Sequence, residues 1–406
     1  MKVLFVHTVS IFESVGGAEV SLKYLATSLA ARGHECVVLV AAPGRGISRK
    51  VEQGVTVIEA GLRNIYWPFD KKDHTRLGKL GWHALDSYNP LMKRVVEQVC
   101  REEKPDVASV HNLPGWSVAA WDALTTCDVP IVQVLHDQYL LCANGTMYRN
   151  GHNCNTQCRS CALLRRPHPR RSRKLAAVVG VSRFILEHHV SNGYFHDVPI
   201  KRVVHNARSP AILGGDQNAL APQPTPTAGG VVFGFIGSLT PAKGIKNLID
   251  AFADLSSESA RLLIAGDASS GYGAVLRSET GDDRVRFLGR VAPRELFERI
   301  DVLVVPSQWR DTFPGVVFES LIFGRTVIAV DHGGAPEMIH HEKNGLLFKA
   351  GSQTALTDAL TRVNENPELA AQLSRQARLD GREYLDVEGW VERYLEIYRD
   401  ALDSRF

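Results

Sequence analysis

The chain has no apolar run of the roughly 18 residues that a helix needs to cross a bilayer. Its N-terminus, Met1–Thr8, holds an apolar stretch that is far too short for a signal peptide, and it predicts a strand instead. Together these absences favour a cytoplasmic protein. In that compartment free thiols are the default state of cysteine, so disulfides are not expected.

A strong excess of charge of one sign is also absent. Lysine and arginine number 47 and aspartate and glutamate number 44, which gives a net charge of +3. Dedicated nucleic-acid-binding proteins are usually more basic, so nucleic acid is not an expected partner. The chain also lacks an Asp-x-Asp triplet, and a catalytic metal is not expected.

What is present is enough apolar sequence for two cores. A chain of 406 residues exceeds one ordinary domain, and its 44% apolar and 22% charged residues are typical of a globular protein. Strand-like and helix-like stretches alternate, which predicts an α/β fold with doubly wound sheets. We expect an N-terminal domain over 1–208 with a cysteine-rich insertion at 142–174, a linker rich in Pro, Ala and Gly over 209–230, a C-terminal domain over 231–388 and a terminal helix over 389–406.

The stretch with the clearest chemistry follows a buried strand that we predict at Val302–Val305. Asp311–Gly315 is predicted to be a loop that runs straight into a short helix over Val316–Phe323. Such a helix start offers unpaired backbone N–H groups and the positive end of a dipole, so it suits a phosphate. A later loop, Gly333-Gly334, permits a second close approach of the backbone.

Two carboxylates lie eight residues apart in the same stretch, Asp311 in the loop and Glu319 inside the helix. A carboxylate beside a bound phosphate is disfavoured, because like charges repel. We therefore expect these two side chains to bind the hydroxyl groups of a sugar or a ribose.

A second phosphate-type element precedes this stretch. Gly237-Ser238 ends a predicted strand, and Lys243 stands just ahead of a predicted helix. The glycine allows a close backbone approach and the lysine supplies a point charge, so this element is predicted to bind a diphosphate. The alternative for Lys243 is an ordinary surface lysine.

A glycine pair and two histidines mark the N-terminal half. Gly16-Gly17 lies at the first turn of a βαβ unit, and His111 and His136 follow two successive predicted strands. Open α/β sheets bind ligands beyond the carboxyl ends of their strands, so these residues predict a ligand site. The alternatives are a plain loop for the glycines and hydrogen-bonded loop positions for the histidines.

Four of the seven cysteines lie within twenty residues, with the spacing C-x11-C-x3-C-x2-C: Cys142, Cys154, Cys158 and Cys161. Four thiolates at such spacing are typical of a structural zinc site, which explains them better than disulfides in a reducing cytosol. Free cysteines in a loop are the alternative. A closed four-cysteine shell leaves no open coordination position, so a catalytic role is not expected.

The most basic stretch of the chain, 165–174, carries five arginines and one lysine. Its simplest interpretation is a solvated surface. Its functional interpretation is docking on an anionic membrane, or on the diphosphate of a lipid-linked acceptor, which would place the protein on the inner face of the membrane. Residues 64–91 mix aromatic and basic side chains, and they predict either an acceptor contact or a helix packed on the domain.

The stretch that begins at Asp311 resembles the retaining glycosyltransferases of family 4, which have the GT-B fold. Their mark is two acidic residues with seven between them, the second in an E-A/S-x-x-x-G-x-P/T-V-I context followed by G-G-x-x-E. Here the pattern is Asp311, Glu319 in ESLIFGRTVI, and GGAPE at 333–337. The first acid is usually Glu in the family, so Asp311 is one methylene shorter. The match extends to GGAE at 16–19 and to Lys243-Gly244.

The resemblance implies two facing Rossmann-like domains with a cleft between them. The N-terminal domain would bind the acceptor, and the C-terminal domain would bind a nucleotide diphosphosugar, most often a UDP-sugar in this family. The helix over 389–406 would cross back to the N-terminal domain. The acceptor would be a glycan, a lipid-linked precursor or a small molecule, and the reaction would retain the anomeric configuration.

The resemblance also implies roles for individual residues. Glu319 would accept hydrogen bonds from the ribose, Asp311 would favour an oxocarbenium-like centre, and Lys243 would bind the donor diphosphate. His136, and to a lesser degree His111, would contact the donor sugar or its phosphate. The other implied contacts are Gly16 and Gly17 in an acceptor or phosphate loop, and Gly237, Ser238, Arg290, Thr312, Phe313, Pro314, Gly315 and Val316 in the donor site. Ser238 stands where many relatives have arginine.

Three other classes fit part of the sequence. A nucleotide-sugar epimerase has the same fold and similar phosphate loops, but it needs no second substrate. A binding protein without turnover agrees with the shorter Asp311. A zinc-stabilised nucleic-acid module would explain the cysteines and the arginines. Only a transferase uses features from both ends of the chain.

Overall fold

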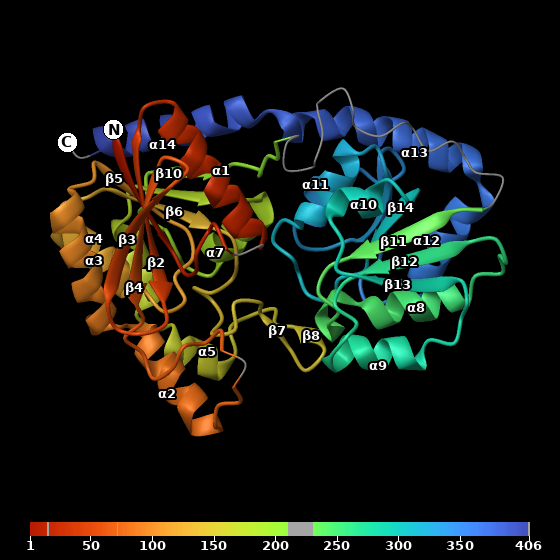
Figure 1. Cartoon of the computed structure of the whole chain (residues 1–406), viewed down its shortest axis with the longest axis horizontal. Helices are drawn as coiled ribbons and strands as arrows, with labels where there is room; N and C mark the ends of the chain where they lie inside the picture. The colour runs from red at the N-terminus through yellow and green to blue at the C-terminus, as the bar shows by residue number, and fades with distance from the viewer. Residues whose placement is uncertain (14–15, 71, 210–229, 405–406) are drawn as a thin grey trace. The chain divides into compact units, whose positions relative to one another are not determined.

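The computed structural model in Figure 1 describes residues 1–13, 16–70, 72–209 and 230–404. The expected linker over 209–230 therefore lies outside the described residues, except for its first and last positions. The chain divides into two compact units, which we describe separately. Unit 1 comprises Met1–Met147, Cys154–His205 and Glu388–Phe406, and unit 2 comprises Tyr148–Asn153 and Asn206–Val387.

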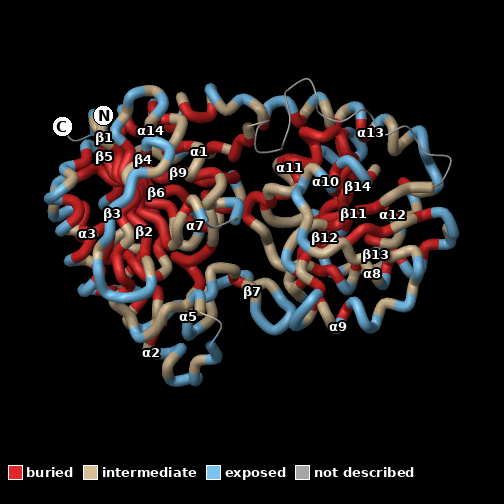
Figure 2. Tube along the Cα trace, in the orientation of Figure 1, coloured by how far each residue is buried: buried red, intermediate tan, exposed pale blue. Residues whose placement is uncertain are grey.

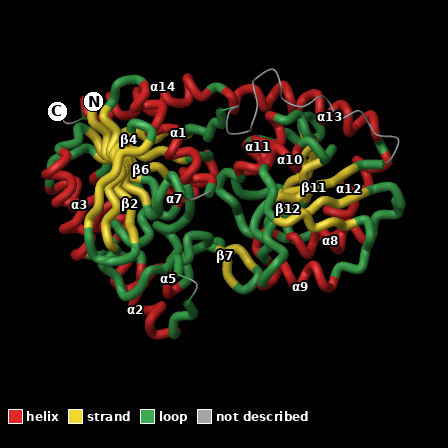
Figure 3. The backbone as a smooth tube through the Cα atoms, in the orientation of Figure 1, coloured by secondary structure: helices red, strands yellow, loops and turns green. Residues whose placement is uncertain are grey.

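Unit 1 is built on one sheet, which helices flank in Figure 3. Its strands lie, in the described part of the unit, in the order β10 (Ile200–Val203), β9 (Ala177–Gly180), β6 (Ile131–Leu135), β5 (Val107–Val110), β1 (Lys2–His7), β2 (Glu35–Ala42), β4 (Val55–Gly61) and β3 (Ile47–Glu52). The pairings are parallel up to β4, and β3 runs antiparallel at the edge. The strands β5 and β6 are buried along their whole length, as expected of parallel strands covered on both faces, and each carries one polar residue, Ser109 or Gln133.

The helices of unit 1 bury an apolar side against this sheet. In α1, Leu22, Leu25 and Leu29 recur at three- and four-residue spacing and are fully buried. The start of α3 is fixed by Asn89, whose side chain accepts hydrogen bonds from the first-turn N–H groups. The helices are α1 (Gly17–Ala31), α2 (Arg76–Ser87), α3 (Pro90–Glu103), α4 (Ala119–Thr126), α5 (Arg159–Leu164), α6 (His168–Arg171), η1 (Ser172–Lys174), α7 (Arg183–Ser191) and α14 (Val387–Asp403).

The helix α14 follows unit 2 in the chain, yet almost all of it belongs to unit 1. Trp390 and Tyr398 are buried against the unit, and the Tyr398 hydroxyl donates a hydrogen bond to Ser109 Oγ in β5 at 2.8 Å. Arg32, at the end of α1, forms an ion pair of 3.3 Å with Glu392. The core of unit 1 is therefore completed by residues from the far end of the sequence.

Unit 2 is built on a second, fully parallel sheet. Its strands are β13 (Val285–Gly289), β12 (Arg261–Ala265), β11 (Val232–Ile236), β14 (Val302–Val305), β15 (Thr326–Val330) and β16 (Gly345–Phe348), in the order in which they pair. Its helices are η2 (Pro241–Lys243), α8 (Ile245–Ala253), α9 (Gly271–Glu279), α10 (Pro293–Phe297), α11 (Gly315–Ile322), η3 (Ala335–Glu337), α12 (Gln353–Glu365), α13 (Pro367–Asp380) and η4 (Gly381–Leu385). A hairpin of β7 (Tyr148–Arg149) and β8 (His152–Asn153) also belongs to this unit.

The expected α/β class with parallel sheets is confirmed, and Figure 2 shows that the buried residues of each unit follow its strands. Two local predictions differ from the structure. The edge strand β3 was not expected, because its exposed residues carry no apolar alternation. Pro336 and Glu337 suit the first turn of a helix, which we expected them to open, but they form only the short turn η3. No helix in the described ranges is both long and apolar enough to cross a membrane.

Candidate active site

In unit 2 the predicted lysine and the predicted acid meet. Lys243 ends η2, just beyond the carboxyl end of β11, and Asp311 lies in the loop beyond β14. These two strands are parallel neighbours, so their loops lie at the same edge of the sheet. Lys243 Nζ is 2.7 Å from Asp311 Oδ2, and the two side chains are 29% and 17% exposed. The pair is therefore partly open to solvent and accessible to a ligand.

Trp309 supplies an unpaired donor beside this lysine. Lys243 Nζ lies 5.1 Å from the centroid of the Trp309 ring. The indole Nε1 of Trp309 is buried and has no hydrogen-bond partner among the residues that the structure describes. A buried N–H group without a partner is costly, so a cation and this N–H group together favour an anionic ligand.

Two glycines allow the loops to pack this closely. Gly244 has a φ of +71°, and a Cβ atom there would lie 1.9 Å from the carbonyl oxygen of Pro306. Gly334 donates its N–H to the Asp311 carbonyl at 2.8 Å, and a Cβ atom on it would lie 2.0 Å from Thr312 O. We expected Gly333-Gly334 to approach a ligand. In the structure the pair packs against the loop that carries Asp311, so its role is to support that loop.

The hairpin of β7 and β8 holds the residues just before Asp311. Asn153 Nδ2 donates to the carbonyl of Gln308 at 2.7 Å, and Asn153 Oδ1 accepts from the N–H of Arg310 at 3.0 Å. We expected the whole of 142–174 to belong to the first domain. Residues 148–153 instead group with unit 2, because this one asparagine satisfies the backbone of the site loop.

Glu319 has a partner that the sequence did not predict. Arg208 Nε donates to Glu319 Oε1 at 2.9 Å, and the two residues are 3% and 9% exposed. The guanidinium also lies over the ring of Phe318, 4.9 Å from its centroid. A buried carboxylate needs such compensation, so the hydrogen bond from Arg208 offsets the burial of Glu319 and fixes its orientation.

The start of α11 is positioned as predicted. Pro314 is its N-cap residue and makes no side-chain cap hydrogen bond, so the first-turn N–H groups of the helix have no capping side chain. Thr312 and Phe313 are buried, and the Phe313 ring packs 5.5 Å from that of Phe318. Phe313 therefore serves the core, and it can offer a ligand only its backbone.

Two further residues that we predicted for the donor site are exposed on the surface of unit 2. Ser238 is exposed beyond β11, next to Gly237. Arg290 has a 79% exposed side chain, and its guanidinium lies 3.3 Å from a carboxylate oxygen of Asp267. An exposed ion pair of this kind holds its side chain weakly, so Arg290 is free to rearrange.

In unit 1 the two predicted histidines are in direct contact. His111 and His136 follow the neighbouring strands β5 and β6, and His111 Nδ1 lies 2.8 Å from His136 Nε2. The chain of contacts continues from His111 Nε2 to Ser109 Oγ at 3.1 Å. Burial lowers the pKa of His136 to about 3 and lowers the pKa of His111 well below its usual value. Both imidazoles are therefore neutral near pH 7, and one donates to the other.

Beside them lies a hydrogen-bonded pair that the sequence analysis missed. His7 ends β1, and its Nε2 is 2.9 Å from Glu19 Oε1. Burial opposes the charge of Glu19, but the hydrogen bond from His7 and its positive charge outweigh burial, so the pKa of Glu19 is lowered. A Cβ atom on Gly16 would lie 2.0 Å from Glu19 Oε2, whereas Gly17 faces open space. A side chain at position 16 would therefore displace the Glu19 carboxylate from its present place.

Comparisons with known proteins decide the family. Residues 216–380 match the model described as glycosyl transferases group 1, and residues 15–207 match the model described as glycosyltransferase family 4. This chain belongs to the group 1 and family 4 glycosyltransferases.

Proteins similar in sequence to this glycosyltransferase carry names that differ from one another. An uncharacterized 42.6 kDa protein in the cps region of Klebsiella pneumoniae is 27% identical over 83% of this chain and 87% of its own. D-inositol 3-phosphate glycosyltransferase of Saccharomonospora viridis is 32% identical over 43% of this chain and 44% of its own. N,N'-diacetylbacillosaminyl-diphospho-undecaprenol alpha-1,3-N-acetylgalactosaminyltransferase of Campylobacter jejuni is 26% identical over 38% and 41%. The chain thus spans less than half the length of the last two.

A solved structure shares the fold of this glycosyltransferase. Anabaena HepE in complex with UDP and glucose superposes with a TM-score of 0.70 over 98% of each chain, at 21% sequence identity. At this identity the likeness shows the fold alone, that of a GT-B glycosyltransferase with Rossmann-like domains.

The cysteines of this glycosyltransferase are only partly gathered. Cys142 Sγ and Cys161 Sγ lie 3.9 Å apart, and Cys158 begins α5 at the N-cap position. Cys154 lies just beyond β8, where its N–H donates to the Met147 carbonyl at 2.7 Å. In the described residues no group of three or more Cys, His, Asp or Glu side chains is arranged to hold a metal ion. The geometry therefore does not fit a four-thiolate zinc site, and zinc stays a prediction.

The basic stretch 165–174 is not a uniform surface. Arg165 is 1% exposed, lies over the Tyr139 ring at 4.1 Å and is electrostatically paired with the buried Asp86. Arg171 is partly buried and forms an ion pair of 2.9 Å with Asp122. The other cations of the stretch, Arg166, Arg170, Arg173 and Lys174, are exposed, so a basic surface remains there and its contact with a membrane stays a prediction.

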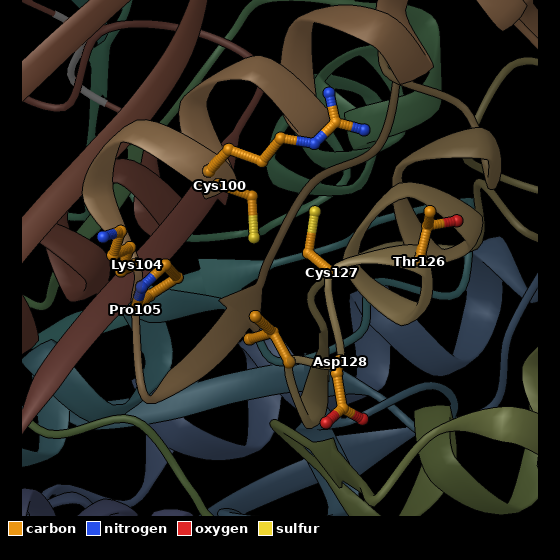
Figure 4. A pocket seen from close by; sticks show the side chains of 8 residues that line it. Cys100, Lys104, Pro105, Thr126, Cys127 and Asp128 are labelled. Atoms are coloured by element: carbon orange, nitrogen blue, oxygen red, sulfur yellow. The ribbon is translucent and has the colours of Figure 1, made fainter.

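A hollow of about 680 Å³ lies elsewhere in unit 1 (Figure 4). It is lined by residues that include Lys104 and Pro105, before β5, and Asp128, before β6. The sulfur atoms of Cys100 and Cys127 point toward one another in it. These residues lie at the amino ends of the strands, whereas parallel sheets bind ligands beyond the carboxyl ends. We therefore do not assign this hollow to the reaction.

Sequence reasoning missed Arg208, His7, Glu19 and Asn153. His7 had the same signal as His111, since it ends a predicted strand, and Glu19 follows the glycine pair. Arg208 had no local signal, because its partner lies 111 residues away. Asn153 likewise depends on contacts 155 and 157 residues away.

Proposed function

We propose that this glycosyltransferase moves a sugar from a nucleotide diphosphosugar to an acceptor hydroxyl with retention of configuration, and that the donor is a UDP-sugar. The observation that carries the proposal is the juxtaposition of Lys243, Asp311 and the Trp309 N–H group at the carboxyl edge of the unit 2 sheet. The HepE structure, which was obtained with UDP and glucose, supports the choice of nucleotide.

The donor diphosphate would compete with Asp311 for Lys243. Once Lys243 binds the diphosphate, Asp311 is released to accept hydrogen bonds from sugar hydroxyls and to stabilise positive charge at the anomeric carbon. The first-turn N–H groups of α11 and the indole N–H of Trp309 would join Lys243 in stabilising negative charge on the leaving diphosphate. Glu319, oriented by Arg208, would accept hydrogen bonds from the ribose.

The proposed reaction needs no covalent intermediate with the enzyme. The bond between the anomeric carbon and the diphosphate oxygen breaks, and the acceptor oxygen forms its bond on the same face. The proton of the acceptor hydroxyl is taken up by an oxygen of the departing diphosphate. We propose no catalytic metal in these steps, since Lys243 and the N–H groups supply the compensating charge. His136 remains our proposed contact to a sugar, because a neutral imidazole suits an uncharged hydroxyl.

For the acceptor we propose a lipid-linked or cell-surface glycan precursor. The Campylobacter relative is named for a diphospho-undecaprenol acceptor, and the Klebsiella relative is named for its cps region. We further propose that the chain works in the cytoplasm, where nucleotide sugars and the inner membrane face are both available.

The first test is a thermal-shift panel with UDP-, GDP-, ADP- and dTDP-sugars, without added metal, on the parent chain and on Lys243→Ala. A shift with UDP-sugars that disappears in Lys243→Ala is expected, because a ligand that binds only the folded state raises its melting temperature. Lys246→Ala is the matched control, since Lys246 is exposed and pairs within α8 with Asp250. An unchanged shift in Lys243→Ala would contradict the diphosphate assignment.

The second test is the product. Incubation with the UDP-sugar and a lipid-linked acceptor, followed by proton NMR of the anomeric centre, should show transfer with retention. Conversion of the UDP-sugar to an epimer without any acceptor would instead identify an epimerase.

A further inference from the structure

A set of large apolar side chains stands exposed on one part of unit 1. It lies on α2, on the segment before α2 and on α5, and we call it the α2 ridge. Its members are Ile65 (57% exposed), Phe69 (55%), Leu77 (81%), Leu80 (59%) and Leu163 (71%). Exposed leucines are ordinary when single, but a group of this kind marks an interaction surface.

The helix α2 presents these leucines on its outer side. Leu77 and Leu80 share an exposed face with Ala84, at spacings of three and four residues. The opposite face buries Trp82, whose indole N–H donates to the Tyr66 carbonyl at 3.1 Å, and Asp86. Figure 1 shows α2 projecting away from the sheet, and Figure 2 shows its outer end exposed. The apolar face is thus held outward by a well-packed inner face.

Exposed cations flank the leucines of the ridge, and two acids, Asp70 and Asp73, lie in the segment before α2. Arg76 and Lys79 are exposed on α2 beside the leucines. In α5 and the residues after it, Arg159, Leu163 and Arg166 are exposed at spacings of three and four residues. The two helices are in contact, and Ser87 at the end of α2 donates a hydrogen bond to the carbonyl of Leu164. The chain also contains no Asp or Glu from Gln138 to Leu186.

We propose that the α2 ridge docks on the surface of an anionic phospholipid bilayer. A projecting ridge of aliphatic and aromatic side chains can enter the boundary between head groups and acyl chains, while flanking cations bind anionic head groups. The charge pattern favours this occupant over a second copy of the chain, since two such ridges would bring like charges together. This surface adds α2 and α5 to the membrane contact that we expected at 165–174, where Arg165 is buried and Arg171 is partly buried.

The purpose of this docking rests on the proposed function, since a membrane surface carries lipid-linked acceptors. The docking itself can be tested without donor or acceptor. The parent chain is floated with vesicles of phosphatidylglycerol and phosphatidylcholine, and separately with phosphatidylcholine alone. We expect flotation with the anionic vesicles, and we expect 0.5 M salt to reduce it because exposed charges are screened.

The decisive variant is Leu77→Ser/Leu80→Ser, which should lower flotation by about tenfold, as the apolar contact supplies much of such binding. The matched control is Val275→Ser/Leu379→Ser in unit 2, where the two side chains are 49% and 52% exposed. Arg76→Gln/Lys79→Gln should weaken flotation and make the remainder less sensitive to salt. The thermal shift with the UDP-sugar should be unchanged in all three, which shows that the variants are folded.

Equal flotation of the parent chain and the ridge variant would overturn the proposal. So would a parent chain that floats with neither vesicle. A parent chain that forms dimers, with the ridge variant monomeric, would assign the ridge to a second copy and also overturn it. If the parent chain floats with anionic vesicles but shows no thermal shift with the UDP-sugar, the proposed function is contradicted and the docking proposal is not.

Discussion

Unit 2 presents charged pairs at the carboxyl edge of its sheet, whereas unit 1 presents mainly neutral imidazoles. In unit 2, Lys243 meets Asp311 at 2.7 Å and Arg208 meets Glu319 at 2.9 Å. In unit 1 the central contact joins His111 and His136, whose pKa values burial lowers. The two sheets have the same parallel architecture, so the side chains at the strand ends make the difference.

This difference separates two kinds of ligand chemistry. The pairs of unit 2 join a lysine or an arginine to a carboxylate, and such groups suit a diphosphate and the hydroxyls attached to it. Buried imidazoles are neutral, so they offer one donor and one acceptor without a net charge. An edge of that kind suits an uncharged sugar better than a phosphate.

The largest effect should come from breaking the buried pair of unit 2. Arg208→Ala leaves the Glu319 carboxylate buried without its partner, which is expected to cost about 3–5 kcal/mol of the free energy of unfolding. Urea unfolding followed by circular dichroism would measure it. A double variant with methionine at 208 and 319 should recover most of the stability but not the binding of a UDP-sugar. Recovery of both would mean that the pair serves the fold only.

Removal of the unit 2 cation should come next. Lys243→Ala is expected to reduce turnover by about 10²–10³-fold, as for the loss of one group that stabilises transition-state charge. Transfer assays with a radiolabelled UDP-sugar would check this, with Lys246→Ala as the control. A higher Michaelis constant for the donor with an unchanged turnover number would show that Lys243 only helps to bind the donor.

The neutral imidazoles of unit 1 should make this unit sensitive to acid. Burial lowers the pKa of His168 to about 3 and of His189 to about 4, as it does for His136. Between these values and the ordinary pKa near 6.5, the unfolded chain binds more protons than the folded chain, so stability falls as the pH falls. Each such histidine contributes about 1.4 kcal/mol per pH unit.

His189→Gln tests this dependence. The slope of unfolding free energy against pH between about 4.5 and 6 should fall by about 1.4 kcal/mol per unit in this variant. Tryptophan fluorescence is the suitable readout, because five of the six tryptophans belong to unit 1 and only Trp309 belongs to unit 2. His196→Gln, at a 76% exposed side chain, is the control and should leave the slope unchanged. Identical slopes in all three proteins would contradict the assignment.

The smallest effect is expected from Asn153→Ala, which tests how the hairpin supports the loop before Asp311. Asn153→Ala removes two hydrogen bonds to Gln308 and Arg310, and it should cost about 1 kcal/mol of stability. Turnover should fall by about fivefold, since small displacements of reacting groups slow catalysis. Arg149→Ala, at an exposed position of the same hairpin, is the control. A stability loss without any change in turnover would limit Asn153 to a structural role.

The sequence predicted most of the fold, because buried parallel strands carry continuous β-branched runs that end in glycine, proline or histidine. It also predicted that His111 and His136 would share one ligand site, since successive strand ends share an edge, whereas the common site of Lys243 and Asp311 was implied by the family resemblance. It could not predict β3, whose exposed residues are polar and are ordered by pairing with β4.

Long-range contacts set the other limit. The sequence around Arg165 is strongly basic and does not indicate that this residue is buried. Its neighbours Tyr139 and Asp86 come from distant segments of the chain. The cysteine spacing predicts zinc, and the sulfur atoms of Cys142 and Cys161 lie 3.9 Å apart, but the described side chains do not form a metal-binding group of three or more. Metal analysis of the purified chain would test that remaining prediction.

The position of α14 has a consequence for how the protein is made. Unit 1 needs Trp390 and Tyr398 for its core, but these residues leave the ribosome only after unit 2 has been synthesised. Most of unit 2 is one continuous segment, whereas unit 1 is assembled from segments at both ends of the chain, so its core can be completed only after α14 has been made. A chain that stops before α14 would leave Ser109 and its strand without their cover.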